Sequence, residues 1–152
     1  MMRPGCDSVR ARHSLIPYGR SVPSLSPTDV PAVGDWNRLL GGQSAVVTGG
    51  GTGIGRAVVE LFVAHGADVH VAEIDARLVS DLNGLHGVTA HTVDVRDPAQ
   101  VALFANTTPT PAVLVNNVGD YRPAVRFPDS DPESWQAMYD VNLLHLFAVT
   151  RA

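Results

Sequence analysis

A glycine-rich segment between a strand-like run and a helix-like run is the feature of this chain that points most clearly to chemistry. A short apolar run, Ser-Ala-Val-Val-Thr at 44–48, is followed by Gly-Gly-Gly-Thr-Gly-Ile-Gly at 49–55, and a helical pattern begins at once. A glycine-rich loop between a strand and a helix presents backbone amides at the positive end of the helix, where a pyrophosphate is stabilised. The sequence therefore predicts a phosphate-binding turn here.

The spacing of these glycines differs from Gly-x-Gly-x-x-Gly, because the third glycine position counted from Gly49 is Ile54. The residues at 48–55 instead match Thr-Gly-x-x-x-Gly-x-Gly. In that pattern Gly49 permits a tight exit from the strand, Gly53 a close approach of backbone to phosphate, and Gly55 packing of the helix on the sheet. A plain loop after a strand is the alternative interpretation.

An acid follows the glycine turn at a distance typical of nucleotide-binding folds. Glu73 lies 18 residues after Gly55, where a carboxylate accepts the hydroxyls of an adenosine ribose. Asp75 is a rival for this role, and a solvated charge is the simpler alternative. A 2′-phosphate beside Glu73 would meet like charge, costing about 4 kcal/mol at ~4 Å and an effective dielectric of roughly 20. Because residues 50–52 include no base, we expect NAD to be preferred over NADP.

Three further polar features follow later in the chain. Asp94 follows an apolar run at 88–93, Asn116-Asn117-Val118-Gly119 follows another at 112–115, and Asn142 interrupts an apolar helical stripe. In a parallel sheet, ligands bind at the carboxyl ends of the strands. Taken singly, these residues also fit a turn, a loop cap and an ordinary helix position. Their order after the glycine turn favours a shared site.

The elements that must position these residues alternate between strand and helix. We expect strands at 44–48, 68–72, 88–93 and 112–115. Helices are expected from a stripe of Ile54, Val58, Leu61 and Phe62 ending near 65–66, over 75–82, after Asp97-Pro98 with Gln100 closing a capping box, and after Asp131-Pro132 with Trp135, Met138, Asn142, Leu146 and Val149 on one stripe. This alternation predicts an α/β fold, a Rossmann-like doubly wound parallel sheet.

Composition excludes several other classes of function. The chain has 152 residues, 11 basic against 15 acidic side chains, and a net charge of −4, which argues against nucleic acid as a partner. Its longest mostly apolar stretch, 143–149, is far too short to span a bilayer. The single Cys6 excludes an intrachain disulfide, so we expect a cytoplasmic protein. The histidines show no spacing typical of metal ligands, so no metal site is expected.

The N-terminal part differs in texture from the rest. Residues 1–39 are rich in Pro, Ser and Arg and show no periodicity, which predicts a disordered, flexible extension before a domain at 40–152. No apolar segment follows the first arginines, so a secretory signal is not expected, whereas a transit peptide stays open as an alternative.

Residues from about 40 to 152 resemble the N-terminal half of a classical short-chain dehydrogenase/reductase (SDR). The matching motifs are the glycine turn, the acid after the second strand, the Asp-Val pair, the Asn-Asn-x-Gly segment and the helix asparagine. The resemblance implies that a dinucleotide cofactor contacts the following residues: Thr48, Gly49, Gly51, Thr52, Gly53, Ile54, Gly55, Glu73, Asp94, Val95, Asn116, Asn117, Val118 and Gly119.

The resemblance also implies roles for individual residues. Glu73 would bind the adenine ribose, Asp94 and Val95 would border the adenine, and 116–119 would support the central strand and the cofactor. Asn142 would be the catalytic-tetrad member that holds a water in the proton relay. Val118 replaces the usual alanine, a modest change of size. By analogy the sheet has four strands in the order 3-2-1-4, fewer than in the family.

The family's reaction is hydride transfer between a nicotinamide and an alcohol or carbonyl carbon, with a serine and a Tyr-x-x-x-Lys pair as further catalytic groups. All 11 basic residues here are arginines, and the sequence stops at Ala152, ten residues after Asn142. We therefore expect a truncated chain that is inactive alone. Three hypotheses stay open: part of an NAD-dependent oxidoreductase of unspecified substrate, a non-catalytic NAD-binding module or complementing partner, or a non-functional remnant. Self-association is expected through the last helix or the exposed sheet edge.

Overall fold

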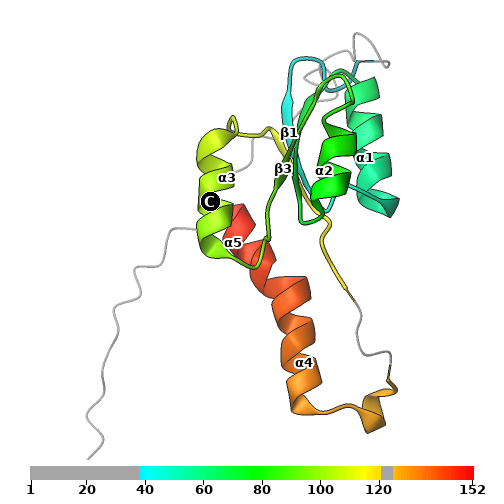
Figure 1. Cartoon of the computed structure of the whole chain (residues 1–152), viewed down its shortest axis with the longest axis vertical. Helices are drawn as coiled ribbons and strands as arrows, with labels where there is room; N and C mark the ends of the chain where they lie inside the picture. Colours follow the sequence, from blue (N-terminus) through cyan, green and yellow to red (C-terminus); the bar gives the residue numbers. More distant parts are fainter. Residues whose placement is uncertain (1–37, 121–124) are drawn as a thin grey trace, which may run out of the picture. The chain divides into compact units, whose positions relative to one another are not determined.

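The computed structural model describes residues 38–120 and 125–152, in which strands and helices alternate along the chain (Figure 1). The predicted extension over 1–39, with Cys6, lies outside the described residues except for its last two. The strands are β1 (Ser44–Thr48), β2 (Asp68–Glu73), β3 (Val88–Thr92) and β4 (Val113–Asn116). The helices are α1 (Gly53–Ala64), α2 (Ala76–Leu82), α3 (Pro98–Thr107), η1 (Phe127–Asp129), α4 (Pro132–Tyr139), η2 (Asp140–Leu144) and α5 (His145–Arg151).

The four described strands form one parallel sheet in the order β3-β2-β1-β4. Val46 of β1 lies opposite His70 of β2 on one side and Leu114 of β4 on the other. The Rossmann-like class and the strand order predicted from the sequence are confirmed. Because all strands run the same way, their carboxyl ends meet at one edge, where the predicted polar residues follow.

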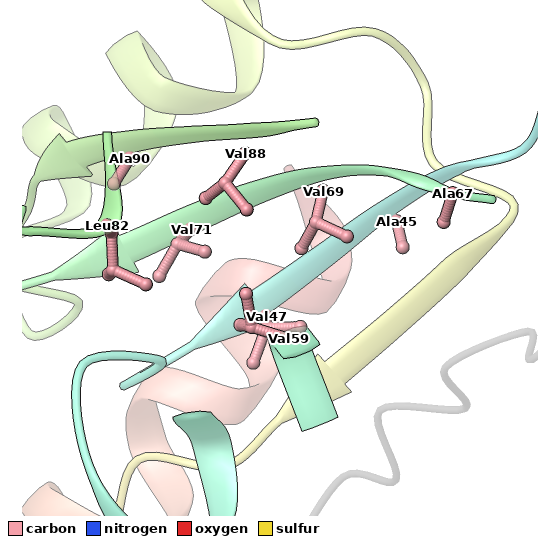
Figure 2. Close-up of a cluster of buried hydrophobic side chains, with 9 residues drawn as sticks. All are labelled: Ala45, Val47, Val59, Ala67, Val69, Val71, Leu82, Val88 and Ala90. Atoms are coloured by element: carbon pink, nitrogen blue, oxygen red, sulfur yellow. The ribbon is translucent and has the colours of Figure 1, made fainter. Parts of the chain in front are cut away.

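One face of the sheet is covered by α1 and α2. Alternate strand residues such as Val47 and Val71 point to this face, where Val59 of α1 and Leu82 of α2 meet them. Figure 2 shows these side chains together, with Val47 and Val59 in close proximity. The four side chains are fully buried, and full burial of a Val or Leu side chain stabilises the fold by about 1.5–3 kcal/mol. This cluster anchors the helix that follows the glycine turn.

The opposite face carries a second apolar cluster beneath α3 and α5 (Figure 1). Val46 and Ala72 of the sheet pack here with Val101 and Phe104 of α3, and Val149 of α5 adds to the same cluster. Helices on both faces leave the sheet doubly covered, as a parallel sheet requires. The cluster also fixes the segment between β3 and α3 that carries Asp94.

The predicted helix starts are confirmed at three aspartates, and one detail of the capping differs. The side chains of Asp75, Asp97 and Asp131 each accept a backbone hydrogen bond at the first turn of α2, α3 and α4. Gln100 does not return a hydrogen bond to the Asp97 amide. Its Oε1 instead accepts from the Asp94 amide at 2.9 Å, while its Nε2 donates to Asp97 Oδ2. The predicted capping box is therefore replaced by a link back to Asp94.

The apolar stripe predicted for α1 is partly wrong. Ile54 is 78% and Leu61 56% exposed, whereas Gly55 and Val59 are buried. Val58 and Phe62 do pack on the core. The face of α1 that meets the sheet is thus the one with Gly55 and Val59, not the predicted stripe. Only a glycine at position 55 lets the first turn come this close to the Gly49 carbonyl.

The last helical segment is not a single α-helix, contrary to the prediction. It passes from α4 through a π-helical turn, η2, into α5. Asn142 lies within this turn, and its side-chain nitrogen Nδ2 donates to the Met138 carbonyl at 2.9 Å. A side chain that competes for a backbone carbonyl widens the helical turn locally. Trp135 does not join the buried stripe but stacks on Phe127 with the ring centroids 5.4 Å apart.

Strand ends differ from the predictions by one residue at most. β2 extends to Glu73, β3 ends at Thr92, and β4 covers 113–116 instead of 112–115. Within the described residues, β4 pairs with β1 alone and its side chains are half-buried. Among the described helices, none combines the length and apolar character needed to cross a bilayer.

Candidate functional site

A cleft of about 540 Å³ opens at the carboxyl ends of the strands. Its volume is within the range of small-molecule and cofactor sites. Segments from every strand end and from the last helical segment contribute to it. The lining residues are Gly49, Thr52, Ala72, Glu73, Ile74, Val93, Asp94, Val95, Arg96, Asn117, Val118, Gly119, Asp120 and Val141.

The glycine turn adopts a backbone conformation that requires glycine. Gly49 and Gly53 have φ angles of +66° and +55°, in the left-handed region that L side chains rarely adopt. At Gly55 a Cβ atom would lie only 2.1 Å from the carbonyl oxygen of Gly49 and 2.6 Å from the side-chain nitrogen Nδ2 of Asn117. The sequence folds this way because α1 begins directly beneath the loop, so its first turn touches the strand it follows.

Glu73 ties the glycine turn to the end of β2. Its Oε2 accepts a hydrogen bond from the Gly51 amide at 2.9 Å, and Oε1 accepts from the amides of Ile74 at 2.8 Å and Asp75 at 3.2 Å. The residue is only 8% exposed. Three backbone donors hold the carboxylate in one orientation at the rim of the cleft. A Cβ on Gly51 would lie 2.7 Å from Oε2, so this close approach also requires glycine.

Thr48 and Asn117 join the glycine turn to the segment after β4. The fully buried Thr48 hydroxyl accepts from the amides of Asn117 at 3.0 Å and Val118 at 3.3 Å. In return, the Asn117 side chain donates to the carbonyl of Gly49 at 2.9 Å. The two loops that border the cleft are therefore cross-linked by hydrogen bonds in both directions.

Asp94 is held by the arginine two residues later. Its Oδ1 accepts from Nε of Arg96 at 2.9 Å and its Oδ2 from Nη2 at 2.7 Å, while the Arg96 amide donates to Oδ1 at 3.0 Å. These hydrogen bonds from Arg96 lower the pKa of the Asp94 carboxyl below its ordinary value, and the same pair raises the pKa of Arg96. The pair presents a fixed carboxylate at the cleft.

Asn142 connects the last helical segment to the loop after β4. Its Oδ1 accepts from the Asp120 amide at 3.0 Å, and its amide nitrogen donates to the Asp120 carbonyl at 2.9 Å. A Cβ on Gly119 would meet Asn142 Oδ1 at 2.9 Å. The Asn142 side chain therefore pairs with the backbone of Asp120 through one accepted and one donated hydrogen bond, which joins the loop to the helix. Asn142 is not among the residues that line the cleft.

A family model described as "short chain dehydrogenase" matches residues 43–152, the part of the chain that contains the sheet and the cleft. The chain belongs to the short-chain dehydrogenase/reductase family.

Individual relatives agree with the family match. The chain is 35% identical over 127 residues to the 3-oxoacyl-acyl-carrier-protein reductase FabG of Chlamydia muridarum, covering 76% of this chain and 50% of that protein. A solved short chain dehydrogenase/reductase family protein superposes with a TM-score of 0.68 at 34% identity, covering 74% and 48% of the two chains. The fold is also shared with a 3-ketoacyl-acyl-carrier-protein reductase from Brucella melitensis complexed with NADH, with a TM-score of 0.68 at 24% identity. The chain thus spans about half the length of its SDR relatives.

The SDR frame brings most of the predicted site residues to one edge of the sheet. Those that line the cleft are Gly49, Thr52, Glu73, Asp94, Val95, Asn117, Val118 and Gly119. Thr48, Gly51, Gly53 and Gly55 lie in or beneath the glycine turn and shape it, without lining the cleft. Ile54 faces outward, and the Asn116 side chain donates to Thr150 of α5 at 3.1 Å.

Several lining residues of this SDR cleft were not predicted. Ile74 directly follows Glu73 and is 59% exposed despite its apolar side chain. Arg96 stands two residues after Asp94, a spacing at which a guanidinium reaches a carboxylate. Asp120 and Val141 come from the loop and helix that Asn142 joins. The Asp-x-Arg spacing could have identified Arg96 from the sequence, whereas the other positions depend on the tertiary fold.

Proposed function

We propose that this chain binds a nicotinamide dinucleotide across the cleft and is the cofactor-binding part of an SDR oxidoreductase. The observation that carries the proposal is the glycine turn whose Gly51 amide is fixed by Glu73 at the rim of a cleft of suitable size. In this proposal the pyrophosphate lies on 49–55, the adenine ribose on Glu73, and the adenine beside Asp94 and Val95. The segment 116–119 supports the cofactor from the β4 side.

We propose NAD as the preferred cofactor. Glu73 already accepts three backbone hydrogen bonds, and a carboxylate offers roughly four lone pairs, so capacity is left for a ribose hydroxyl donor. At neutral pH a 2′-phosphate is mostly ionised, so it offers Glu73 little hydrogen-bond donation. It also carries negative charge, as Glu73 does. Among the described residues that line the cleft, Arg96 alone is basic, and it is paired with Asp94.

The complete reaction we propose is hydride transfer between the nicotinamide and an alcohol or carbonyl substrate, with a role for Asn142 in the proton relay. Residues 1–152 contain no lysine, so the family's Tyr-x-x-x-Lys pair is not among them. General acid–base groups contribute about 10²–10⁴-fold to a rate. We accordingly propose that these 152 residues alone bind the cofactor without turning over substrate.

The proposal includes self-association of this chain. Exposed apolar side chains gather on the last helical segment, where Leu143, Leu144 and Phe147 are 47–59% exposed, and within the described residues one side of β4 has no neighbouring strand. Apolar surface and a free strand edge both favour pairing with another chain. Analytical ultracentrifugation tests this part, and a monodisperse monomer with a sharp cooperative melt contradicts it.

The binding proposal is tested by following the fluorescence of NADH during a titration with the purified chain. Replacing Gly53, which has φ +55° and open space around it, by valine strains the phosphate-binding turn and is expected to abolish binding. Gly42 provides a matched control because it also has a positive φ, +72°, and open surroundings but lies outside the cleft lining. Gly42→Val should lower stability similarly and leave NADH binding intact. Equal binding by both variants contradicts the proposal.

A further inference from the structure

The outer edge of β3 is covered by the turn that precedes this strand. Within the described residues β3 pairs with β2 alone, and the Gly87 carbonyl and the Val93 amide form hydrogen bonds with that neighbour. Because backbone groups alternate in direction along a strand, those of Ala90, at the middle of β3, point away from β2. An open strand edge is a template for pairing with another chain, so the groups that cover it matter.

The side chain of Asn83, the residue after α2, pairs with this edge as a neighbouring strand would. Its Oδ1 accepts from the Ala90 amide at 2.8 Å, and its Nδ2 donates to the Ala90 carbonyl at 3.1 Å. One carboxamide therefore satisfies both outward backbone groups of Ala90, because it carries an acceptor and a donor side by side. The Val88 amide is covered as well, by the Leu85 carbonyl at 3.4 Å.

The residue after Asn83 gives the same carboxamide a second chemistry. Asn83 is the one asparagine of the sequence that precedes a glycine. In such a pair the glycine nitrogen attacks Cγ of the asparagine, and no Cβ on the glycine hinders the approach. The Cγ–Nδ2 bond breaks, ammonia leaves with the amide proton, and a succinimide ring forms. Water then opens the ring at either carbonyl, which gives aspartate or isoaspartate with no change of oxidation state.

In the folded chain the reacting groups are all engaged. The Gly84 amide donates to the Asp81 carbonyl at 3.2 Å, and both polar atoms of the Asn83 side chain are bound to Ala90. An attack by the Gly84 nitrogen therefore requires the turn over 83–90 to open first. Asn83 and Gly84 are both exposed, so water reaches the ring once it has formed.

We propose that Asn83 is a deamidation site that is protected by the strand edge it closes. While the two hydrogen bonds to Ala90 persist, the reaction depends on local opening of the turn. After the reaction, aspartate has no donor for the Ala90 carbonyl and places a negative charge against it, so the edge no longer closes. Deamidation thus converts a transient opening of the β3 edge into a permanent one. This inference goes beyond the cofactor proposal and uses no part of it.

The test measures loss of ammonia at Asn83 by peptide mass spectrometry, after incubation of the purified full chain near neutral pH in buffer and in guanidinium chloride. We expect Asn83 to react at least about tenfold faster in the denaturant, because the rate in the folded chain is reduced by the small population of open turns. The products should include isoaspartate, which only the succinimide yields. Asn106, which is exposed and precedes Thr107, is the internal reference and should react far more slowly in the denaturant.

Gly84→Ala is the matched control for the chemistry. A Cβ at this position meets only the Asp81 carbonyl oxygen, at 3.2 Å, so the turn keeps its form while the attack is hindered. Hydrogen exchange of the Ala90 amide reports on the edge itself. The amide should be equally protected in the unmodified chain and in Gly84→Ala, and it should exchange at least about tenfold faster in Asn83→Asp and in Asn83→Ala.

The inference is overturned by equal reaction rates of Asn83 in buffer and in denaturant, or by Asn106 reacting as fast as Asn83 in the denaturant. It is also overturned if Gly84→Ala loses ammonia as fast as the unmodified chain, or if Ala90 stays equally protected in both Asn83 variants. None of these measurements involves a dinucleotide. Their failure leaves the proposed function intact, and a chain that binds no cofactor leaves this inference intact.

Discussion

Replacing Glu73 by glutamine is the perturbation that tests cofactor choice most sharply. Glutamine keeps the length of the side chain and one oxygen, which still accepts from the Ile74 and Asp75 amides. Its NH₂ group takes the place of Oε2, which accepts from the Gly51 amide at 2.9 Å. The variant therefore removes the negative charge and places the glutamine NH₂ group, a donor, against the Gly51 amide, also a donor.

The size of the effect follows from the charge and its surroundings. One pair of unit charges at ~4 Å and an effective dielectric of roughly 20 repels by about 4 kcal/mol. Glu73 itself is 8% exposed, but the cleft is open, so solvent and salt screen part of the repulsion. We expect the unmodified chain to bind NAD at least a hundredfold more tightly than NADP, about 2.7 kcal/mol. In Glu73→Gln the ratio should fall below about tenfold, with weaker NAD binding from the disturbed turn.

The assay is a calorimetric titration of the unmodified chain and of Glu73→Gln with NAD and with NADP, at low and moderate salt. Glu60→Gln is the matched control, because Glu60 carries the same charge on α1, is 57% exposed, pairs with Arg56 and lies outside the cleft lining. The control should keep the discrimination of the unmodified chain. If Glu73→Gln also keeps it, Glu73 is not the group that excludes the 2′-phosphate, and the reasoning is refuted.

Three further predictions concern stability. Thr48→Val leaves two loop amides without their acceptor and should lower the free energy of unfolding by about 2–3 kcal/mol in urea denaturation; Thr48→Ser should recover most of it, and equal losses would contradict the role of the hydroxyl. Gly55→Ala places a Cβ 2.1 Å from the Gly49 oxygen and should lower the melting temperature and abolish NAD binding, so an unchanged variant would disprove the close packing. Burial lowers the pKa of His70 and of His145, so the unfolded chain takes up these protons first and stability should fall as pH drops below about 6.5. His70→Gln and His145→Gln should each flatten this dependence in thermal melts followed from pH 8 to pH 5, and an unaltered slope in both would refute the assignment.

Local sequence was enough to predict the parallel sheet, whereas its strand order came from the resemblance to the SDR family. Apolar runs of four to six residues separated by capped helices dictate a parallel α/β arrangement, and the order β3-β2-β1-β4 agrees with it. Aspartates before a helix have few alternatives as N-caps, which explains the success at Asp75, Asp97 and Asp131. The position of Glu73 at a strand end likewise follows from the chain alone.

Other features depend on contacts between distant segments. The π-helical turn coincides with Asn142, whose side-chain nitrogen Nδ2 donates both to the Met138 carbonyl and to the carbonyl of Asp120, 22 residues earlier. Gln100 was expected to cap its own helix, but the chain before α3 returns close enough for it to bind the Asp94 amide instead. The outward rotation of Ile54 reflects the approach of Gly55 to the strand. Helical periodicity contains none of this information. The cofactor-contact roles assigned to 48–55, 73, 94–95, 116–119 and 142 stay predictions.

The most direct test of the account is a calorimetric titration of the purified 152-residue chain with NAD, with NADP in parallel and circular dichroism as the check on folding. The account predicts saturable binding of NAD with one site per chain and much weaker binding of NADP. A folded chain that releases no binding heat with NAD, and that leaves the fluorescence of NADH unchanged, would contradict the claim that this cleft is a dinucleotide site.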